Sequence, residues 1–290
     1  MFTGALVALI TPFRDGEVDF ETLDELVAFH IENGIDGIAP VGTTGESPTL
    51  SHDEHKKVIE RVVKTVAGRV PVIAGAGSNS TAEAIELAAF SKKVGADATL
   101  QVDPYYNKPT QEGFYQHFKT IAEEVDLPMV LYDIPSRCGA GMTADTVVRL
   151  AQIENIVAIK DATGSLDHVS EIATRCDLTI LSGDDSLTLP IASVGGKGVI
   201  SVVANIVPAD VKAMTDLILE GDLVSARQWH NKLFALSKGM LTLATNPIPI
   251  KAAMAMLDMA PEEMRLPMVP MEESKKAVLR EALKAYGLLG

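Results

Sequence analysis

Eight short apolar runs place the strongest constraint on how this chain folds. The runs are Ala5–Ile10, Gly37–Pro40, Val70–Ala74, Ala98–Val102, Pro128–Tyr132, Ile156–Lys160, Leu178–Leu181 and Gly198–Val202. Each run is rich in Val, Ile, Leu or Ala and lacks the polar alternation of a strand with one solvated face. This pattern predicts parallel strands that are covered on both sides.

Amphipathic segments separate these runs. They predict helices at Thr22–Glu32, His52–Val66, Thr81–Val94, Gly113–Glu124 and Thr143–Leu150. Strands that recur every 20 to 35 residues or so, each followed by a helix, are typical of an α/β (β/α)8 TIM barrel. A doubly wound sheet usually has fewer strands and a glycine fingerprint after the first, whereas Thr11-Pro12-Phe13 follows the first run here.

The chain continues for about 85 residues beyond the last run, which is more than the final barrel helix needs. These residues predict helices at Leu217–Leu243, Ile248–Leu257 and Glu272–Ala285, with a break at Asn246-Pro247-Ile248-Pro249. No flexible linker sets them apart. We therefore expect a catalytic barrel at residues 1–220 and an attached C-terminal helical extension at residues 221–290.

Charge and composition narrow the range of partners. The formal net charge of −14 repels phosphate backbones, so the sequence predicts no nucleic-acid partner and no anionic membrane partner. No apolar run approaches the roughly 20 residues that span a bilayer, and the N-terminus does not resemble a signal peptide. Cys138 and Cys176 form neither a disulfide framework nor a metal-binding pattern, which favours a cytoplasmic protein without a metal site.

Lys160 ends the sixth apolar run and is followed by Asp161-Ala162-Thr163-Gly164. A lysine in such a place often only extends its ammonium group into water. In a barrel, however, the C-terminal ends of the strands carry the active site. Burial there would lower the pKa of Lys160 and leave a neutral amine that attacks a carbonyl. This position alone leaves both interpretations open.

Three further polar clusters follow predicted strands. Gly42–Ser47 combines two glycines with two threonines, which suits carboxylate binding and is more than a loop before a helix capped by Ser51 needs, so we favour a binding site. Tyr132–Arg137 offers a proton carrier and a carboxylate-binding guanidinium, and Asp103–Asn107 contains two tyrosines. Each cluster is weak alone, but four on one rim of a barrel favour an active site.

These segments together resemble the dihydrodipicolinate synthase group of the pyruvate-dependent aldolase and lyase family. The resemblance runs nearly end to end. The segments that carry it are Phe2–Gly4, Gly42–Ser47, Pro71–Gly75, Pro104–Asn107, Tyr132–Arg137, Ile159–Gly164, Ser182–Asp185, Gly198–Ser201 and Asn246–Pro249. It implies that Lys160 forms a Schiff base with pyruvate, which then condenses with L-aspartate 4-semialdehyde to give 4-hydroxy-tetrahydrodipicolinate for lysine biosynthesis.

The resemblance also implies a role for each matching residue. Tyr132 would move protons through a relay with Thr43 and Tyr106. Substrate carboxylates would be held by Thr44, for pyruvate, and by Arg137, for the semialdehyde. Gly183 and Ile200 would line the pocket. No cofactor is implied, and the expected assembly is a homotetramer in which Tyr105 or Tyr106 crosses a dimer interface.

Two alternatives remain open at this stage. Sugar-acid lyases and dehydratases of the same family share the lysine and the tyrosine but usually lack an arginine at the position of Arg137. A non-catalytic barrel that binds a metabolite would not need the proton relay. Asp133 and Asp161 depart from the Asn and Glu that are common in the synthases. Asp133 therefore predicts extra negative charge near the site.

The resemblance also predicts a site for L-lysine as a feedback inhibitor. The matching residues are Ser47, His52, His55, Asn79, Glu83 and Tyr105. Pro48 departs from the small residue that is usual at its position, which would weaken inhibition. An ordinary polar helix start explains His52 and His55 equally well.

Overall fold

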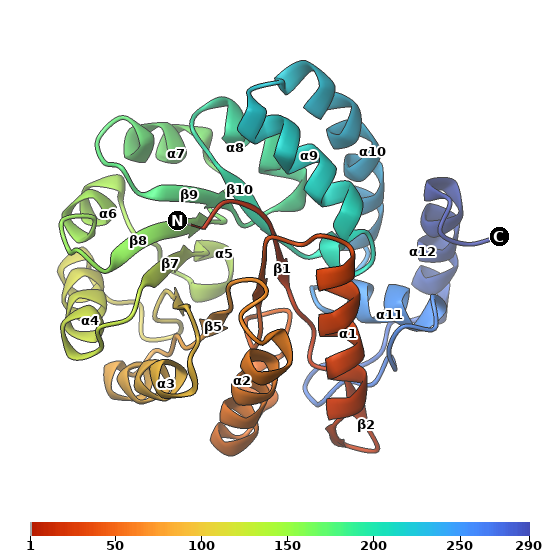
Figure 1. The fold of residues 1–290 in the computed structure, drawn as a ribbon, viewed down its shortest axis with the longest axis horizontal. Coiled ribbons are helices and arrows are strands. Elements are labelled where there is room, and N and C mark those ends of the chain that lie inside the picture. The colour runs from red at the N-terminus through yellow and green to blue at the C-terminus, as the bar shows by residue number, and fades with distance from the viewer. Residues whose placement is uncertain (1) are drawn as a thin grey trace.

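A ring of parallel strands forms the centre of the computed structural model, which describes residues 2–290 (Figure 1). The strands are β1 (Gly4–Ala8), β4 (Gly37–Ala39), β5 (Ile73–Gly75), β6 (Ala98–Val102), β7 (Met129–Asp133), β8 (Ile156–Asp161), β9 (Thr179–Ser182) and β10 (Gly198–Ser201). Their order is β4-β1-β10-β9-β8-β7-β6-β5, and a parallel bridge between Ile38 and Val72 joins the two ends. The predicted TIM barrel is confirmed, and each of the eight predicted strands overlaps an observed one.

Helices surround the ring. They are α1 (Phe20–Glu32), α2 (His52–Val66), α3 (Thr81–Val94), α4 (Gln111–Glu124), α6 (Ala144–Leu150), α7 (Leu166–Ala173) and α8 (Thr188–Ser193). Local capping explains several boundaries. Ser51 and Glu54 form a reciprocal capping box at the start of α2, as the sequence indicated for Ser51. Gly95 ends α3 in the left-handed conformation that favours glycine.

Strand alternation separates two buried layers. The interior layer contains Val130, Tyr132 and Ala158, whereas Leu131 and Ile159 pack with the apolar residues of the outer helices. Successive strand residues point to opposite faces, so Lys160 belongs to the interior side and its neighbour Asp161 to the helical side. The same alternation sends Asp133 outward. These directions determine which polar residues reach the centre of the barrel.

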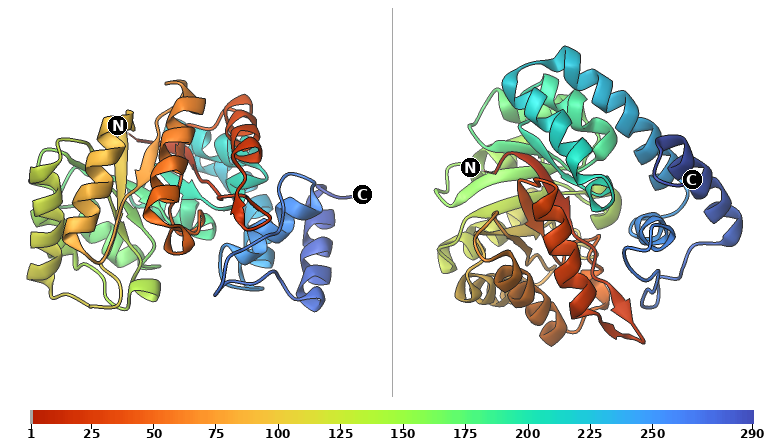
Figure 2. Two further views of the ribbon diagram at one scale, coloured as in Figure 1. Left: turned by 90° about the horizontal axis from the view of Figure 1, so that it is seen from below. Right: turned by 45° about the vertical axis from the view of Figure 1, so that its right-hand side comes forward.

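The C-terminal part forms four helices, α9 (Pro208–Glu220), α10 (Leu223–Leu241), α11 (Ile248–Met256) and α12 (Glu273–Tyr286), the last two of which lie to one side of the barrel (Figure 2). The prediction of one helix over Leu217–Leu243 was wrong. Gly221 ends α9 with φ +83°, and Asp222 caps α10 by accepting a hydrogen bond from the Ser225 N–H. Sequence periodicity continued across this Gly-Asp pair and concealed the break.

The extension shares its core with the barrel. Leu236 of α10 and Leu279 of α12 belong to the same buried cluster as Val7 of β1 and Leu26 of α1. The division at residues 1–220 and 221–290 therefore remains a proposal about chain organisation. The short elements that were not predicted include the hairpin of β2 (Phe13–Arg14) and β3 (Glu17–Val18) and the one-turn helix α5 (Pro135–Cys138). None of the helices in the described part of the chain has the length and apolar character that crossing a membrane requires.

Candidate active site

Lys160 and Tyr132 lie side by side at the C-terminal ends of β8 and β7. The register of the two strands pairs the residues directly, and the Nζ atom of Lys160 lies 4.2 Å from the centroid of the Tyr132 ring. Both side chains are buried, at 5% and 4% exposure. Within residues 2–290, the Lys160 amine has no hydrogen-bond or ion-pair partner. A buried amine without a counterion beside a phenol is suited to nucleophilic attack coupled to proton transfer.

The loop after β4 brings backbone and hydroxyl groups to the same end of the barrel. A Cβ atom on Gly45 would lie 2.9 Å from the backbone of Val41, so only glycine allows this close approach. Thr44 is buried, and Thr43 lines a neighbouring cavity. Glu46 adopts the left-handed conformation at φ 53°. The loop is thus held in one tight shape that places both threonines at the rim.

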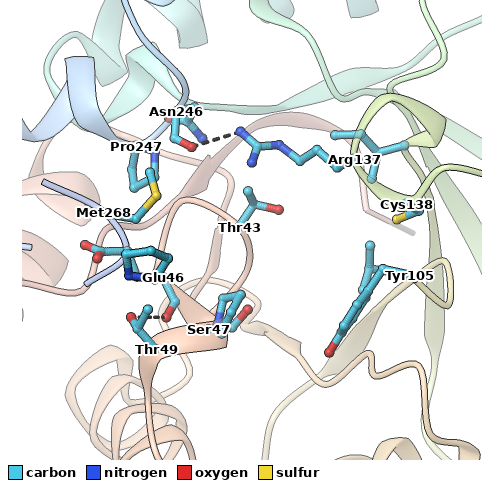
Figure 3. A pocket seen from close by; sticks show the side chains of 14 residues that line it. Thr43, Glu46, Ser47, Thr49, Tyr105, Arg137, Cys138, Asn246, Pro247 and Met268 are labelled. Carbon is cyan, nitrogen blue, oxygen red and sulfur yellow. Dashed lines mark hydrogen bonds between the residues drawn. The ribbon is translucent and has the colours of Figure 1, made fainter. Parts of the chain in front are cut away.

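Asn246 links the two predicted carboxylate-binding residues. Its side-chain Nδ2 donates to Thr44 Oγ1 at 3.0 Å, and its backbone carbonyl accepts from Arg137 Nη2 at 2.9 Å. Arg137 belongs to α5 and extends across the cavity toward Asn246 (Figure 3). A residue of the C-terminal part therefore orients groups that come from two barrel loops.

A cavity of about 340 Å³ lies between these loops and the C-terminal part. Its walls include Thr43, Arg137 and Asn246 (Figure 3). Val102 and Ile134 also line it, and both pack against the interior layer that contains Tyr132. Lys160 itself is not among the lining residues. The cavity therefore lies at the end of the barrel where the strands finish, on the same rim as Lys160, and does not enclose the amine.

The remaining predicted residues occupy distinct places. Ile200 is fully buried in the interior layer with Tyr132. Gly183 follows β9, where a Cβ atom would lie 2.6 Å from that of Ala162, so glycine is required by close packing. Tyr106 is 91% exposed with φ 73°, and it does not reach Tyr132 within this chain. The relay expected to run through Tyr106 is therefore not assembled within this single chain.

Asp133 and Asp161 lie behind the site rather than in it. Both are buried on the helical side of the barrel, at 0% and 1% exposure. The Asp161 carboxylate binds His168 Nδ1 at 2.8 Å, and this bond raises the pKa of His168. Neither aspartate lines the cavity. The negative charge that the sequence suggested near the substrates is thus directed away from them.

The predicted L-lysine residues fall in one area between α2, α3 and the loop after β6. His52 Nε2 lies 3.3 Å from Glu83 Oε1, and Asn79 Nδ2 donates to the carbonyl of Tyr105 at 3.0 Å. His55 is buried against the Gly75 carbonyl, its Nε2 2.7 Å away, and burial lowers its pKa. Ser47 and Tyr105 also line the cavity next to Arg137.

Two buried ionic groups near the site were not predicted from the sequence. Lys251 of α11 forms an ion pair with Glu46, and both side chains are almost completely enclosed. Asp185 accepts hydrogen bonds from Ser201 and from the backbone N–H groups of Val202 and Val203. Glu46 could be recognised in the sequence as the acidic residue of the Gly42–Ser47 loop. The lysine that neutralises it lies 205 positions away, so no local pattern connects them.

Comparison with known proteins identifies the family. A model of the dihydrodipicolinate synthetase family matches residues 1–286. The chain belongs to this family. A relative from Methanocaldococcus jannaschii, a 4-hydroxy-tetrahydrodipicolinate synthase, is 55% identical over 290 residues, which cover 100% of each chain.

Solved structures of dihydrodipicolinate synthases have the same fold. One from Acinetobacter baumannii, chloride-inhibited and complexed with pyruvate, is 44% identical with a TM-score of 0.97 and covers 100% of both chains. Another, from Cyanidioschyzon merolae with lysine bound, is 43% identical with a TM-score of 0.96 and covers 99% of both chains. The fold and family predicted from the sequence are thereby confirmed.

Proposed function

We propose that this chain condenses pyruvate with L-aspartate 4-semialdehyde through a Schiff base on Lys160, giving 4-hydroxy-tetrahydrodipicolinate in the lysine pathway. The observation that carries the proposal is the buried, unpaired amine of Lys160 beside the Tyr132 ring. Full-length relatives that are 4-hydroxy-tetrahydrodipicolinate synthases support the choice of reaction. The solved relative complexed with pyruvate supports the first substrate.

The reaction needs an amine, a proton carrier and two carboxylate sites. The Lys160 amine adds to the keto carbon of pyruvate and water leaves, which forms a protonated imine. The imine withdraws electrons, so the methyl group loses a proton and the resulting enamine attacks the aldehyde carbon. The product is then an imine on Lys160, and the amino group of the former semialdehyde adds to the imine carbon, displaces the Lys160 amine and closes the ring. Tyr132 is close enough to Lys160 to carry these protons, with Thr43 and Tyr106 completing the relay. This chemistry requires no cofactor.

The two substrate carboxylates are assigned to different groups. Thr44 holds the carboxylate of pyruvate, and Arg137 binds that of the semialdehyde. Asn246 contacts both residues, which keeps the two binding groups in register. Gly183 and Ile200 are assigned to the surroundings of Lys160 at the strand ends, outside the walls of the cavity. A sugar-acid lyase is the alternative within the family, and a cationic Arg137 at the cavity favours the anionic semialdehyde.

Assembly into a homotetramer of two dimers is part of the proposal. Tyr106 is 91% exposed in the single chain, so a neighbouring subunit is needed to bring it to a relay. Ser47, His52, His55, Asn79, Glu83 and Tyr105 form the proposed site for L-lysine as inhibitor, supported by the solved relative with lysine bound. A cytoplasmic location and the lack of a nucleic-acid partner also remain proposals, consistent with the net charge of −14.

Borohydride reduction in the presence of pyruvate tests the mechanism. We expect a pyruvate-sized adduct on Lys160 by peptide mass spectrometry, together with turnover of aspartate semialdehyde. Lys251 is the matched control, because it is also buried but is paired with Glu46, and it is expected to stay unmodified. An adduct without turnover redirects the substrate search to sugar-acid aldehydes. Absence of any adduct on Lys160 rejects the Schiff-base mechanism.

A further inference from the structure

Four titratable side chains form a buried cluster on the helical side of β6, β7 and β8. Asp103 directly follows β6, Asp133 ends β7, Asp161 ends β8 and His168 comes from α7. Asp103 and Asp133 are both 0% exposed. None of the four was assigned a step in the reaction described above. The cluster nevertheless lies directly behind the strand ends that carry Tyr132 and Lys160.

The charges of this cluster do not balance if every carboxyl group is ionised. His168 binds Asp161 at 2.8 Å through Nδ1, and its Nε2 is 4.0 Å from the Asp133 carboxylate. No lysine or arginine in residues 2–290 forms an ion pair with the three aspartates. Three carboxylates against one imidazolium leave two negative charges in a place closed to water. The free-energy cost of burying two uncompensated negative charges is normally relieved when a carboxylate binds a proton.

The hydrogen-bond pattern locates where a proton is missing. Asp103 Oδ1 and both carboxylate oxygens of Asp133 are buried without a well-formed hydrogen bond, and the backbone N–H of Met142 makes only a weak contact with Asp133. The register of β6 and β7 pairs Val102 with Tyr132, so the next residues, Asp103 and Asp133, lie side by side on the same face of the strands. Burial and the neighbouring Asp133 raise the pKa of Asp103 to about 10, and burial also raises the pKa of Asp133. One proton between the two groups supplies the missing donor.

Asp103 holds α5 at both of its ends. Its Oδ2 accepts from the N–H of Ile134, which precedes α5, at 3.3 Å. Its backbone carbonyl accepts from the thiol of Cys138, the last residue of α5, at 3.3 Å. The chain beyond α5 packs closely on Asp133, because a Cβ atom on Gly141 would lie 2.7 Å from Asp133 Oδ1. The two aspartates therefore contact the segments before and after Arg137.

We propose that Asp103 and Asp133 share one proton and that this acid pair positions α5 so that Arg137 receives the second substrate. Loss of the proton leaves two facing carboxylates, whose repulsion loosens the hold on Ile134 and Cys138. Lys160 and Tyr132 lie on the opposite face of the strands, so imine formation with pyruvate is not affected. The consequence for the semialdehyde rests on the proposed function, whereas the shared proton does not.

Other titratable groups face this pair and affect its titration. Asp161 raises the pKa of both aspartates, while His168 lowers that of Asp133. The Cys138 thiol is also close, and its own pKa is raised to about 12, mainly by burial and then by the two aspartates. Arg137, which lines the cavity, opposes this shift and lowers the pKa of the same thiol. Single replacements within the pair are therefore more informative than a pH profile alone.

Infrared spectroscopy tests the shared proton without any substrate. At neutral pH we expect the carbonyl band of a protonated carboxylic acid, shifted in heavy water. Asp103→Asn and Asp133→Asn should each abolish the same band, because an amide supplies the donor that the proton supplied. Asp167→Asn, which removes an exposed carboxylate next to His168, should retain it. Absence of the band in the unmodified chain, or its survival in both single variants, would overturn the shared proton.

Kinetics tests the positioning role. From about pH 8 to about pH 10 we expect the KM for the semialdehyde to rise in the unmodified enzyme and to stay flat in Asp133→Asn. Borohydride trapping of pyruvate should give the same yield in both. An identical rise of KM in both enzymes would overturn the positioning role. If neither enzyme turns over the semialdehyde, the proposed function fails, and the infrared result still decides whether the proton is shared.

Discussion

Lys251 and Glu46 form an ion pair that joins the C-terminal helix α11 to the loop carrying Thr43 and Thr44. The Lys251 amine also donates to the Glu263 carbonyl at 2.9 Å and lies 4.3 Å from the centroid of the Phe13 ring. Burial lowers the pKa of Lys251, while Glu46 opposes that shift. The pair thus ties the extension to the part of the site assigned to the pyruvate carboxylate.

Removing one partner of this pair is expected to destabilise the folded chain. Lys251→Met or Glu46→Gln leaves a buried charge or donor without its counterpart and should lower the free energy of unfolding by about 3–5 kcal/mol. The double variant should recover much of that loss, because no charge is then left buried alone. Urea unfolding of the three variants measures this. Single variants that are as stable as the unmodified chain would show that losing one partner of the pair does not destabilise the fold.

Asp103 makes stability depend on pH. Its pKa is about 10 in the folded chain and close to 3.8 when exposed, so the folded chain binds an extra proton between these values. Stability contributed by that proton falls as pH rises through this window. Asp103→Asn should therefore be more stable than the unmodified chain at neutral pH, with a difference that widens toward pH 9. Thermal unfolding at several pH values measures it, and a difference that narrows as pH rises contradicts the assignment.

Arg137 is expected to act on one substrate. Arg137→Ala removes a charged hydrogen-bond donor, typically worth about 1.5–3 kcal/mol, so the KM for the semialdehyde should rise by about 10- to 100-fold. The KM for pyruvate should change little. Arg149→Ala is the control, because Arg149 lies on the surface over Tyr115 and pairs with Glu112. A rise confined to the KM for pyruvate would reassign Arg137.

L-lysine should inhibit at millimolar concentration, and Glu83 should carry part of the effect. Glu83 accepts from Ser78 and lies beside His52, so its carboxylate is placed to bind an ammonium group. Glu83→Gln should weaken inhibition by about 10-fold or more. Glu86 lies on the same helix but pairs with Lys56, so Glu86→Gln should leave inhibition unchanged. A rate that is indifferent to millimolar L-lysine refutes the site.

The two cysteines should differ in reactivity although one of them lines the cavity. The pKa of Cys138 is raised to about 12, chiefly by burial and then by Asp103 and Asp133, so it stays a thiol at neutral pH. Cys176 is only partly buried. Alkylation at pH 8 followed by peptide mapping should label Cys176 first. Faster labelling of Cys138 would indicate that α5 opens in solution.

The sequence predicted the barrel because parallel strands covered on both faces leave apolar runs that are easy to recognise. It also identified the polar strand ends, since Lys160 and Tyr132 interrupt such runs. Long-range pairs were beyond its reach. Nothing local links Glu46 to Lys251 or Asp103 to Asp133, because the first pair needs α11 to pack on the barrel and the second needs β6 to pair with β7.

Two errors have different causes. The break at Gly221 was visible as a glycine followed by a capping residue, but the apolar periodicity on both sides concealed it. The direction of Asp133 followed from strand alternation and was available from the sequence once β7 was assigned. The charge of Asp133 was considered without the direction of its side chain, so the carboxylate was expected on the substrate side of the strand.

Residues 246–268 supply the partner of Arg137, the donor to Thr44 and, through Pro267 and Met268, part of the cavity wall. The barrel strands are therefore not a self-sufficient catalyst on which a tail has been added. A chain shortened after α10 would keep Lys160 but lose part of the cavity wall and the hydrogen-bond partner of Arg137. For engineering, exchange of this single segment between relatives offers a way to alter acceptor choice while the strands stay untouched.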